Sequence, residues 1–253
     1  MGASNSYNFL QLMKKLFENI KTIFYALIIA LIIRTLFFQP FYIPSSSMEP
    51  NLQVGDRLFV SKYSYGYSRH SLPFSPKIIN NRIFDDKPER GDVIVFKTPS
   101  DNRTDYIKRL VGIPGDTIQI INEDLYLNNI KVVKTKLEKK ISINCGDEIL
   151  DTELYEETLP SGKKYIVTYR KNGTMVNTDK FLVPENHYFF MGDNRDCSRD
   201  SRFLSSVGYV NFNNLVGKAQ IIFFSNDANK GSFFKFWSWS KSIRFERFFK
   251  KIK

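Results

Sequence analysis

The feature that most constrains this chain is an apolar run close to its N-terminus. Residues 23–33 have the sequence IFYALIIALII, and the 17 residues of 22–38 contain a single charge, Arg34. This length is close to the shortest helix that crosses a bilayer. Three interpretations compete: a cleaved signal peptide, a buried core helix and a membrane anchor.

The composition of the run and of its flanks favours the anchor. A cleaved signal peptide needs small residues in an A-x-A-like arrangement after the apolar run, whereas Gln39-Pro40-Phe41-Tyr42 follows here. A core helix would carry a polar stripe, and this segment is apolar all round. Arg34 can extend its guanidinium to the interface. We therefore expect a single transmembrane helix over 22–38.

Lysines indicate how the helix is oriented. Lys14, Lys15 and Lys21 precede the run, and no Lys or Arg lies between Thr35 and Val54. Positively charged flanks stay in the cytoplasm. The sequence thus predicts a cytoplasmic tail over 1–21 and a single-pass protein whose body is exported.

The exported body is predicted to be mostly β. Short runs rich in β-branched and aromatic residues alternate with turn signals such as Pro114-Gly115 and Asn172-Gly173. Residues 122–182 are richer in Lys, Glu, Asn and Thr but keep strand-like runs. We interpret them as an inserted β subdomain that separates two parts of a catalytic core, 39–121 and 183–230.

The net charge of +11 is concentrated at the C-terminus, where residues 231–253 hold seven basic residues and one acid, Glu246. Aromatic residues alternate with these cations, a mixture that suits the headgroup region of a membrane. Membrane lipid is therefore an expected partner of this basic aromatic tail, and a terminal helix packed on the domain is the alternative. No nucleic acid partner is expected, because the exported side offers little of it.

Cysteine and histidine are rare. The chain has Cys145, Cys197, His70 and His187, and no spacing resembles a metal site. We expect no metal and no cofactor. A bridge between the two cysteines and two unpaired thiols both remain open. Neither histidine has a nucleophile-base setting, so a histidine-based triad is not favoured.

Three segments contain side chains that could do chemistry. The first, PFYIPSSSMEPNL at residues 40–52, places three serines between prolines directly after the apolar run. A turn and a capping box at the start of a helix are the ordinary interpretations. A nucleophilic serine close to the membrane surface is the third.

The second segment is DYIKRLVGIPGD at residues 105–116. In a strand, Tyr106, Lys108 and Leu110 point to the same face. Such a lysine usually lies on a solvated face. If it is buried, its pKa falls from about 10.4 because the ammonium loses hydration, and the neutral amine can then take a proton from a serine hydroxyl.

The third segment is GDNRDCSRDSRF at residues 192–203. Charges that alternate in sign are typical of a solvated loop held by ion pairs. The segment could also support a catalytic lysine, with Ser198 orienting the amine and a pair of Asp200 and Arg202 fixing the loop.

Together, and in this order, these segments resemble type I signal peptidases, a family of bacterial serine-lysine proteases. The similarity is carried by ALIIALIIRTLFFQPFYIPSSSM, RGDVIVFK, YIKRLVGIPGD and GDNRDCSRDSR, between residues 26 and 203. It implies a β-rich catalytic fold with an inserted β subdomain and removal of signal peptides from exported preproteins, after small residues at −1 and −3. It also implies a location in the bacterial inner membrane, with the catalytic domain on the outer, periplasmic face.

The resemblance assigns roles by position. Ser47 matches the nucleophile and Lys108 the general base. Ser45 matches the hydroxyl that forms the oxyanion hole with the backbone N–H of Ser47. Ser198 matches the residue that orients the lysine.

The remaining matches are structural. Asp200 and Arg202 match the supporting ion pair. The positions expected to line the substrate pocket are mostly apolar: Phe41, Ile43, Pro44, Met48, Leu52, Val95, Tyr106 and Ile107.

Two positions depart from the family pattern. Ser46 stands where Gly is frequent and can change local backbone freedom. Asn51 stands where Thr or Ala is usual and is expected to change little. Neither departure touches a proposed catalytic residue. Two other functions are alternatives: a maturation peptidase dedicated to one substrate, and a membrane-tethered binding protein without catalysis. The binding protein would leave YIKRLVGIPGD and GDNRDCSRDSR without a role.

Overall fold

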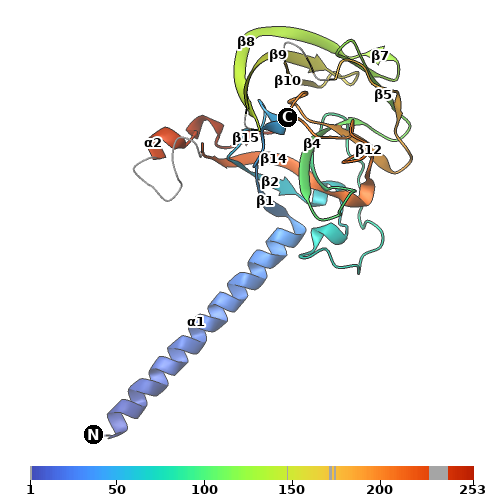
Figure 1. Cartoon of the computed structure of the whole chain (residues 1–253). Helices are drawn as coiled ribbons and strands as arrows, with labels where there is room; N and C mark the ends of the chain where they lie inside the picture. Colours follow the sequence, from blue (N-terminus) through green and yellow to red (C-terminus); the bar gives the residue numbers. More distant parts are fainter. Residues whose placement is uncertain (1, 147, 171–172, 174, 228–238) are drawn as a thin grey trace.

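The computed structural model describes residues 2–146, 148–170, 173, 175–227 and 239–253. A long helix, α1 (Gly2–Leu36), projects from one end of a β-rich body (Figure 1). Within it, Gln11–Leu36 is long and apolar enough to cross a membrane, and its side chains are exposed. The expected fold, an N-terminal apolar helix followed by a mostly β domain, is confirmed.

The predicted end of the transmembrane helix was two residues too late. Helix α1 ends at Leu36, and Phe38 already pairs with Ser61 across β1 and β2. Pro40 lies within β1, where its missing N–H excludes a continued helix but is tolerated at a sheet edge. The chain therefore passes from helix to sheet within two residues.

The central sheet is antiparallel and has the order β1-β2-β14-β3-β4-β12-β13, with β15 also paired to β14. Its strands are β1 (Phe38–Tyr42), β2 (Asp56–Ser61), β3 (Val93–Lys97), β4 (Asp105–Gly112), β12 (His187–Met191), β13 (Val210–Asn211), β14 (Leu215–Ser225) and β15 (Lys250–Lys251). One apolar cluster lies around β1, β2, β3 and β14, and another around β3, β4 and β12. Strands that are distant in sequence are thus neighbours in the core.

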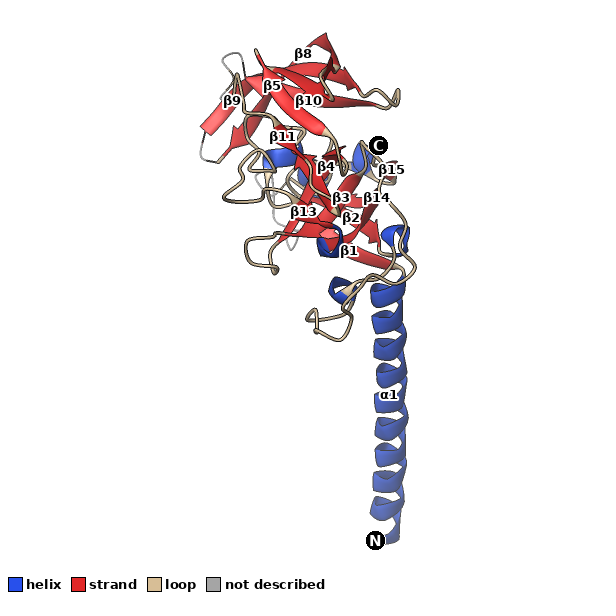
Figure 2. Cartoon of the chain, turned by 90° about the vertical axis from the view of Figure 1, so that its right-hand side faces the viewer, coloured by secondary structure: helices blue, strands red, loops and turns tan. Residues whose placement is uncertain are grey.

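Two smaller sheets are formed by the part of the chain that connects β4 to β12. They lie at the end of the body away from α1 (Figure 2). One contains β5 (Thr117–Ile121), β6 (Asp124–Leu127), β7 (Ile130–Lys131) and β11 (Phe181–Leu182). The other contains β8 (Val133–Cys145), β9 (Glu148–Thr158) and β10 (Lys164–Arg170). The predicted subdomain boundary at 122 was late, because β5 pairs with β6 and β11 rather than with the core sheet.

The described part of the C-terminal segment packs on the core sheet. Helix α2 (Trp239–Ser242) and the short η6 (Phe245–Arg247) precede β15. The Arg247 guanidinium is buried and donates to Asp56 Oδ1 at 2.9 Å, and Ile252 packs against the core. Residues 231–238 of the predicted basic tail lie outside the described residues.

Candidate active site

The serine-rich segment after β1 forms one turn of 3-10 helix, η1 (Ser46–Met48). Met48 is fully buried in the core and anchors the turn. The Ser47 carbonyl accepts the backbone N–H of Asn194 at 3.2 Å. These contacts hold the Ser47 side chain at the edge of the core, with 8 % of the residue exposed.

Lys108 reaches this serine from β4, in the middle of the sheet. It is only 4 % exposed and pairs with Ile94 of β3. Its Nζ lies 2.6 Å from Ser47 Oγ and 3.0 Å from the Ile107 carbonyl oxygen. The two side chains that sequence analysis singled out are therefore within proton-transfer distance.

Burial lowers the pKa of the Lys108 amine to about 8, because the ammonium loses its hydration. The negative charges of Asp200 and Asp193 oppose this fall, and the charge of Arg202 adds to it. The neutral amine is thus accessible at mildly alkaline pH. A neutral lysine amine in contact with a serine hydroxyl can act as its general base.

Ser45 stands beside the same hydroxyl. Its Oγ lies 3.3 Å from Ser47 Oγ, and the residue is exposed to solvent. An exposed hydroxyl next to a nucleophile can donate to the oxygen of a bound carbonyl. The structure therefore brings together Ser45, Ser47 and Lys108.

The segment 192–202 lies buried behind the amine rather than on the surface. Arg202 Nε donates to Asp200 Oδ1 at 2.8 Å, and both side chains are buried. Burial disfavours the Asp200 carboxylate, but the charge of Arg202 outweighs it and holds the pKa of Asp200 below its usual value. The ion pair expected here is formed.

Ser198 does not make the hydrogen bond that was expected of it. Its side chain is buried near the site, but among the described residues the Lys108 amine bonds only to Ser47 and to the Ile107 carbonyl. A Cβ built on Gly192 would lie 2.4 Å from the Ser198 Cβ and 2.5 Å from the Ser47 carbonyl oxygen. The loop and the nucleophile turn approach closely because position 192 has no side chain.

Sequence analysis missed a buried ion pair directly beside the lysine. Arg109 Nε donates to Asp193 Oδ1 at 2.7 Å and Nη2 to Oδ2 at 2.7 Å, with both side chains almost fully buried. Asn51 Nδ2 donates to the same carboxylate at 2.7 Å and to the Ile166 carbonyl at 2.7 Å. Asn51, a departure from the family pattern that was expected to change little, thus links the nucleophile segment to the 192–202 segment and to β10.

A second missed pair ties the inserted sheet to this loop. Arg195 Nη1 and Nη2 donate to the two Glu157 oxygens at 2.7 and 2.6 Å, and the pair is buried. Glu157 lies on β9 and also accepts from Tyr165 and Tyr169. The alternating charges of 192–203 could have indicated these ion pairs. Their partners could not be read from the sequence, because those of Arg195 and Asp193 are 38 and 84 residues away.

Most of the predicted pocket residues share one apolar cluster. It contains Phe41, Ile43, Met48, Leu52, Val95 and Ile107. Pro44 is exposed beside this cluster. Tyr106 packs with the neighbouring cluster, and its ring centroid lies 5.3 Å from Lys108 Nζ.

Cys145 and Cys197 form a disulfide with a Cα–Cα distance of 5.7 Å. It joins the end of β8 to the loop that contains Ser198. Of the two possibilities left open by the sequence, the structure has the bridge. The described residues contain no group of three or more His, Cys, Asp or Glu that could hold a metal ion.

Comparison with known proteins assigns the chain to a family. A family model described as signal peptidase, peptidase S26, matches residues 16–224. The chain belongs to this signal peptidase family. The family consists of serine peptidases, so the chain is a hydrolase of the signal peptidase I type.

Relatives match along almost the whole chain. Signal peptidase I of Rickettsia typhi is 40 % identical over 246 residues, covering 90 % of each protein. Signal peptidase I of Rickettsia bellii is 40 % identical over 249 residues, covering 92 % of this chain and 84 % of the relative. A signal peptidase I crystal structure from Enterococcus faecalis matches with 26 % identity and a TM-score of 0.31, over 53 % of this chain and 97 % of the other.

Proposed function

We propose that this signal peptidase family member removes N-terminal signal peptides from exported preproteins with a Ser47–Lys108 dyad. The observation that carries the proposal is the 2.6 Å separation of Lys108 Nζ and Ser47 Oγ, with both residues buried. The proposal applies to preproteins as a class rather than to one dedicated substrate.

The acylation step uses the neutral amine. Lys108 Nζ takes the Ser47 proton as Oγ attacks the scissile carbonyl carbon, and a tetrahedral oxyanion forms. The Ser45 hydroxyl and the Ser47 backbone N–H donate to this oxyanion; losing one such donor costs about 10²–10³ in rate. The ammonium then returns its proton to the leaving amine, and the signal peptide stays bound to Ser47 as an ester.

Deacylation repeats the sequence with water. The neutral amine takes a proton from a water molecule that attacks the ester carbonyl, and Ser47 Oγ leaves with that proton. Asp200 and Asp193 keep the amine from losing its basicity entirely, because their charges raise its pKa against the effect of burial. A base near neutral pKa suits both proton transfers.

Selection of small residues at −1 and −3 is proposed to come from the apolar cluster next to the dyad. Phe41, Ile43 and Ile107 belong to it, and an apolar wall of such bulky side chains is expected to accept small apolar substrate residues. Substrates with bulky residues at these positions would displace a strand edge or remain unbound.

The membrane arrangement is also a proposal. Helix α1 spans the bacterial inner membrane with residues 1–21 in the cytoplasm, because Lys14, Lys15 and Lys21 flank its cytoplasmic side. The catalytic domain then lies on the outer, periplasmic face. Since β1 begins two residues after α1 ends, Ser47 lies near the surface where a signal peptide leaves the bilayer.

Single substitutions of the dyad test the activity. Ser47→Ala and Lys108→Met should each lower kcat for preprotein cleavage by at least about 10⁴-fold, since a nucleophile and its base act as a unit. Ser142→Ala and Lys140→Met, both on the exposed β8, serve as matched controls and should cleave normally. Cleavage should be measured by release of mature protein from several unrelated preproteins reconstituted with the full chain.

Two results would contradict the proposal, and a third would disqualify the variant that gives it. Normal processing by either dyad variant would remove Ser47 or Lys108 from the chemistry. Loss of membrane insertion in the same variants would point to misfolding instead. Cleavage of a single preprotein among the panel would favour a dedicated maturation peptidase.

A further inference from the structure

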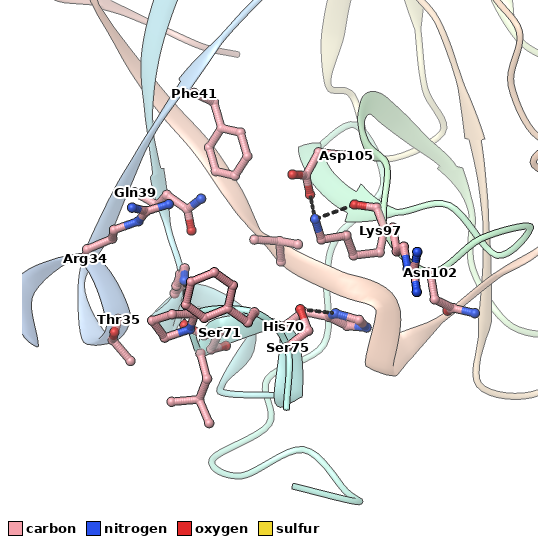
Figure 3. A pocket seen from close by; sticks show the side chains of 16 residues that line it. Arg34, Thr35, Gln39, Phe41, His70, Ser71, Ser75, Lys97, Asn102 and Asp105 are labelled. Carbon is pink, nitrogen blue, oxygen red and sulfur yellow. Dashed lines mark hydrogen bonds and ion pairs between the residues drawn. The ribbon is translucent and has the colours of Figure 1, made fainter. Parts of the chain in front are cut away.

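A cavity of about 380 Å³ lies between the end of α1 and the core sheet (Figure 3). Arg34 and Thr35 line it from the helix, Gln39 and Phe41 from β1, and residues 70–75 from the loop after β2. Its far wall is the β3–β4 hairpin and the loop between these strands. Apart from Phe41, none of these residues has a part in the proposed peptidase chemistry.

The cavity is strongly cationic. Its walls hold four basic side chains, Arg34, Lys62, Lys97 and Arg103, against one carboxylate, Asp105. That carboxylate is already paired, because Lys97 Nζ lies 2.8 Å from Asp105 Oδ1. No ion pair joins the other three cations to the cavity walls, although the charge of Asp105 also acts on Lys62.

Two of these cations are free to bind a ligand. The guanidinium groups of Arg34 and Arg103 are on exposed residues, and neither forms a hydrogen bond or ion pair with any described residue. Figure 3 shows the Arg34 side chain turned from the helix end toward Gln39 at the cavity wall. Ten N–H donors on two guanidinium groups thus remain for solvent or for an anion.

Lys62 is the buried cation at the base of the cavity. It is 3 % exposed, and its Nζ donates to the Ser71 carbonyl oxygen at 2.6 Å. Burial, and then the nearby charge of Arg34, lower its pKa to about 8. Like charges held together in a partly dehydrated site are stabilised by an anion.

Large apolar and aromatic side chains are exposed on the elements that line the cavity and on segments that follow them in the chain. Exposed large side chains on the end of α1, on β1 and on the segments after β2 are Phe37, Phe38, Tyr42, Tyr63, Phe74, Ile78 and Phe84. Phe74 is fully exposed and also lines the cavity. Both views show the loop after η3 (Arg69–Ser71) beside the last turns of α1, and Tyr67 Oη fixes this region by donating to the Leu36 carbonyl at 2.8 Å (Figures 1 and 2).

We propose that this cavity binds the phosphate of an anionic glycerophospholipid, whose acyl chains lie along α1. Cations at the end of a transmembrane helix, surrounded by exposed aromatic residues, match the headgroup depth of a bilayer. A headgroup with its own cation would neutralise the phosphate, so a net negative lipid such as phosphatidylglycerol fits three unpaired cations better than phosphatidylcholine does. The inference rests on the membrane span of α1 in the proposed function.

Native mass spectrometry of the full chain tests the site. The detergent-solubilised protein should retain dioleoyl phosphatidylglycerol in preference to dioleoyl phosphatidylcholine. Each exposed cation near a lipid surface contributes about fivefold to binding, so Arg34→Gln with Arg103→Gln should lower retention by about 25-fold. A matched pair on the exposed part of β8, Lys139→Gln with Lys140→Gln, should retain the lipid as the unmodified chain does.

Several outcomes would overturn the site. Equal losses in the two double variants would indicate a general effect of surface charge, and no loss in either would remove the cavity from lipid binding. Displacement of phosphatidylglycerol by inorganic phosphate at matched ionic strength would indicate a free anion site. If Arg34→Gln with Arg103→Gln raised KM for a lipid-free signal peptide and retained the lipid, the cavity would be a peptide cleft.

A further arm separates this inference from the peptidase proposal. Ser47→Ala should retain phosphatidylglycerol like the unmodified chain, because the cavity does not include Ser47. A chain that retains the lipid through Arg34 and Arg103 but cleaves no preprotein would contradict the activity alone. A chain that cleaves preproteins but shows no preference for phosphatidylglycerol would contradict the lipid site alone.

Discussion

Lys108 and Arg109 are consecutive residues of β4, and they occupy opposite faces of the sheet in different electrostatic settings. Both are at least 96 % buried, with 4 % and 1 % of each residue exposed. Lys108 bonds to a hydroxyl and a carbonyl, whereas Arg109 binds the Asp193 carboxylate through two hydrogen bonds. Burial lowers the pKa of Lys108 to about 8, while Asp193 more than offsets the same effect and raises the pKa of Arg109.

This contrast shows that burial alone does not decide the state of a cation. The hydrogen-bond partners of Lys108 are neutral, and the charges of Asp200 and Asp193 offset its desolvation only in part, so the amine is a usable base. A bidentate carboxylate keeps Arg109 charged, and its remaining donors reach the carbonyls of Gly91 and Lys253 at 2.8 and 2.9 Å. One face of β4 is suited to proton transfer. On the other face, Arg109 connects Asp193, Gly91 and Lys253.

The largest effect should come from breaking the charged partner of Arg109. Asp193→Asn leaves a buried guanidinium uncompensated and should lower the free energy of unfolding by about 3–5 kcal/mol, as measured by urea unfolding in detergent. Glu156→Gln removes the exposed partner of Lys164 and should cost less than about 1 kcal/mol. Equal losses in the two variants would contradict the assigned role of the buried pair.

A smaller effect of opposite sign is expected at Lys108. Its pKa falls from 10.5 to about 8, so below pH 8 the folded state bears a cost of up to about 3 kcal/mol that Lys108→Met removes. The unfolded state also loses the proton as pH rises above 10.5, so the gain should shrink between pH 8 and 10.5 and vanish beyond that range. Urea unfolding across this range is the measurement, with the exposed Lys140→Met as a control that stays unchanged. A gain independent of pH would show that packing, not charge, caused it.

The smallest effect concerns the pH dependence of cleavage. Since the neutral amine is needed, kcat/KM should rise with pH and reach half its maximum near pH 8. Asp200→Asn removes a charge that raises the Lys108 pKa and frees the charge of Arg202, which lowers it. The acid limb should therefore move to lower pH, whereas Asp151→Asn on the exposed part of β9 should leave it in place. An acid limb that moves upward in Asp200→Asn would contradict the electrostatic account.

Much of the fold could be predicted from local patterns. The apolar run 23–33, the alternation of apolar residues in the strands and the change of composition after residue 121 are all properties of neighbouring residues. Their bounds were less accurate, because pairing partners decide where an element ends. Phe38 belongs to a strand because it pairs with Ser61, and β5 belongs to the smaller sheet because it pairs with β6.

The candidate site was predicted in part. Ser47 and Lys108 were found by their ordered motifs, and the structure places them in contact across a separation of 61 residues. Ser198 was expected to bond the amine and does not. The sequence predicts little consequence for Asn51, yet it connects Asp193 to β10. No local pattern could indicate this, because its partners are 142 and 115 residues away.

By itself, the sequence determined that this protein has one long apolar helix and a β-rich body, and it predicted the side chains of a serine-lysine peptidase. Hydropathy, residue periodicity and motif order depend on neighbouring residues, so they can be followed along the chain. Only the tertiary structure decided which cations keep their charge, whether Cys145 and Cys197 pair, and that a cationic cavity lies beside α1. These properties depend on the desolvation and on the partners of each group, and the register of distant strands sets both.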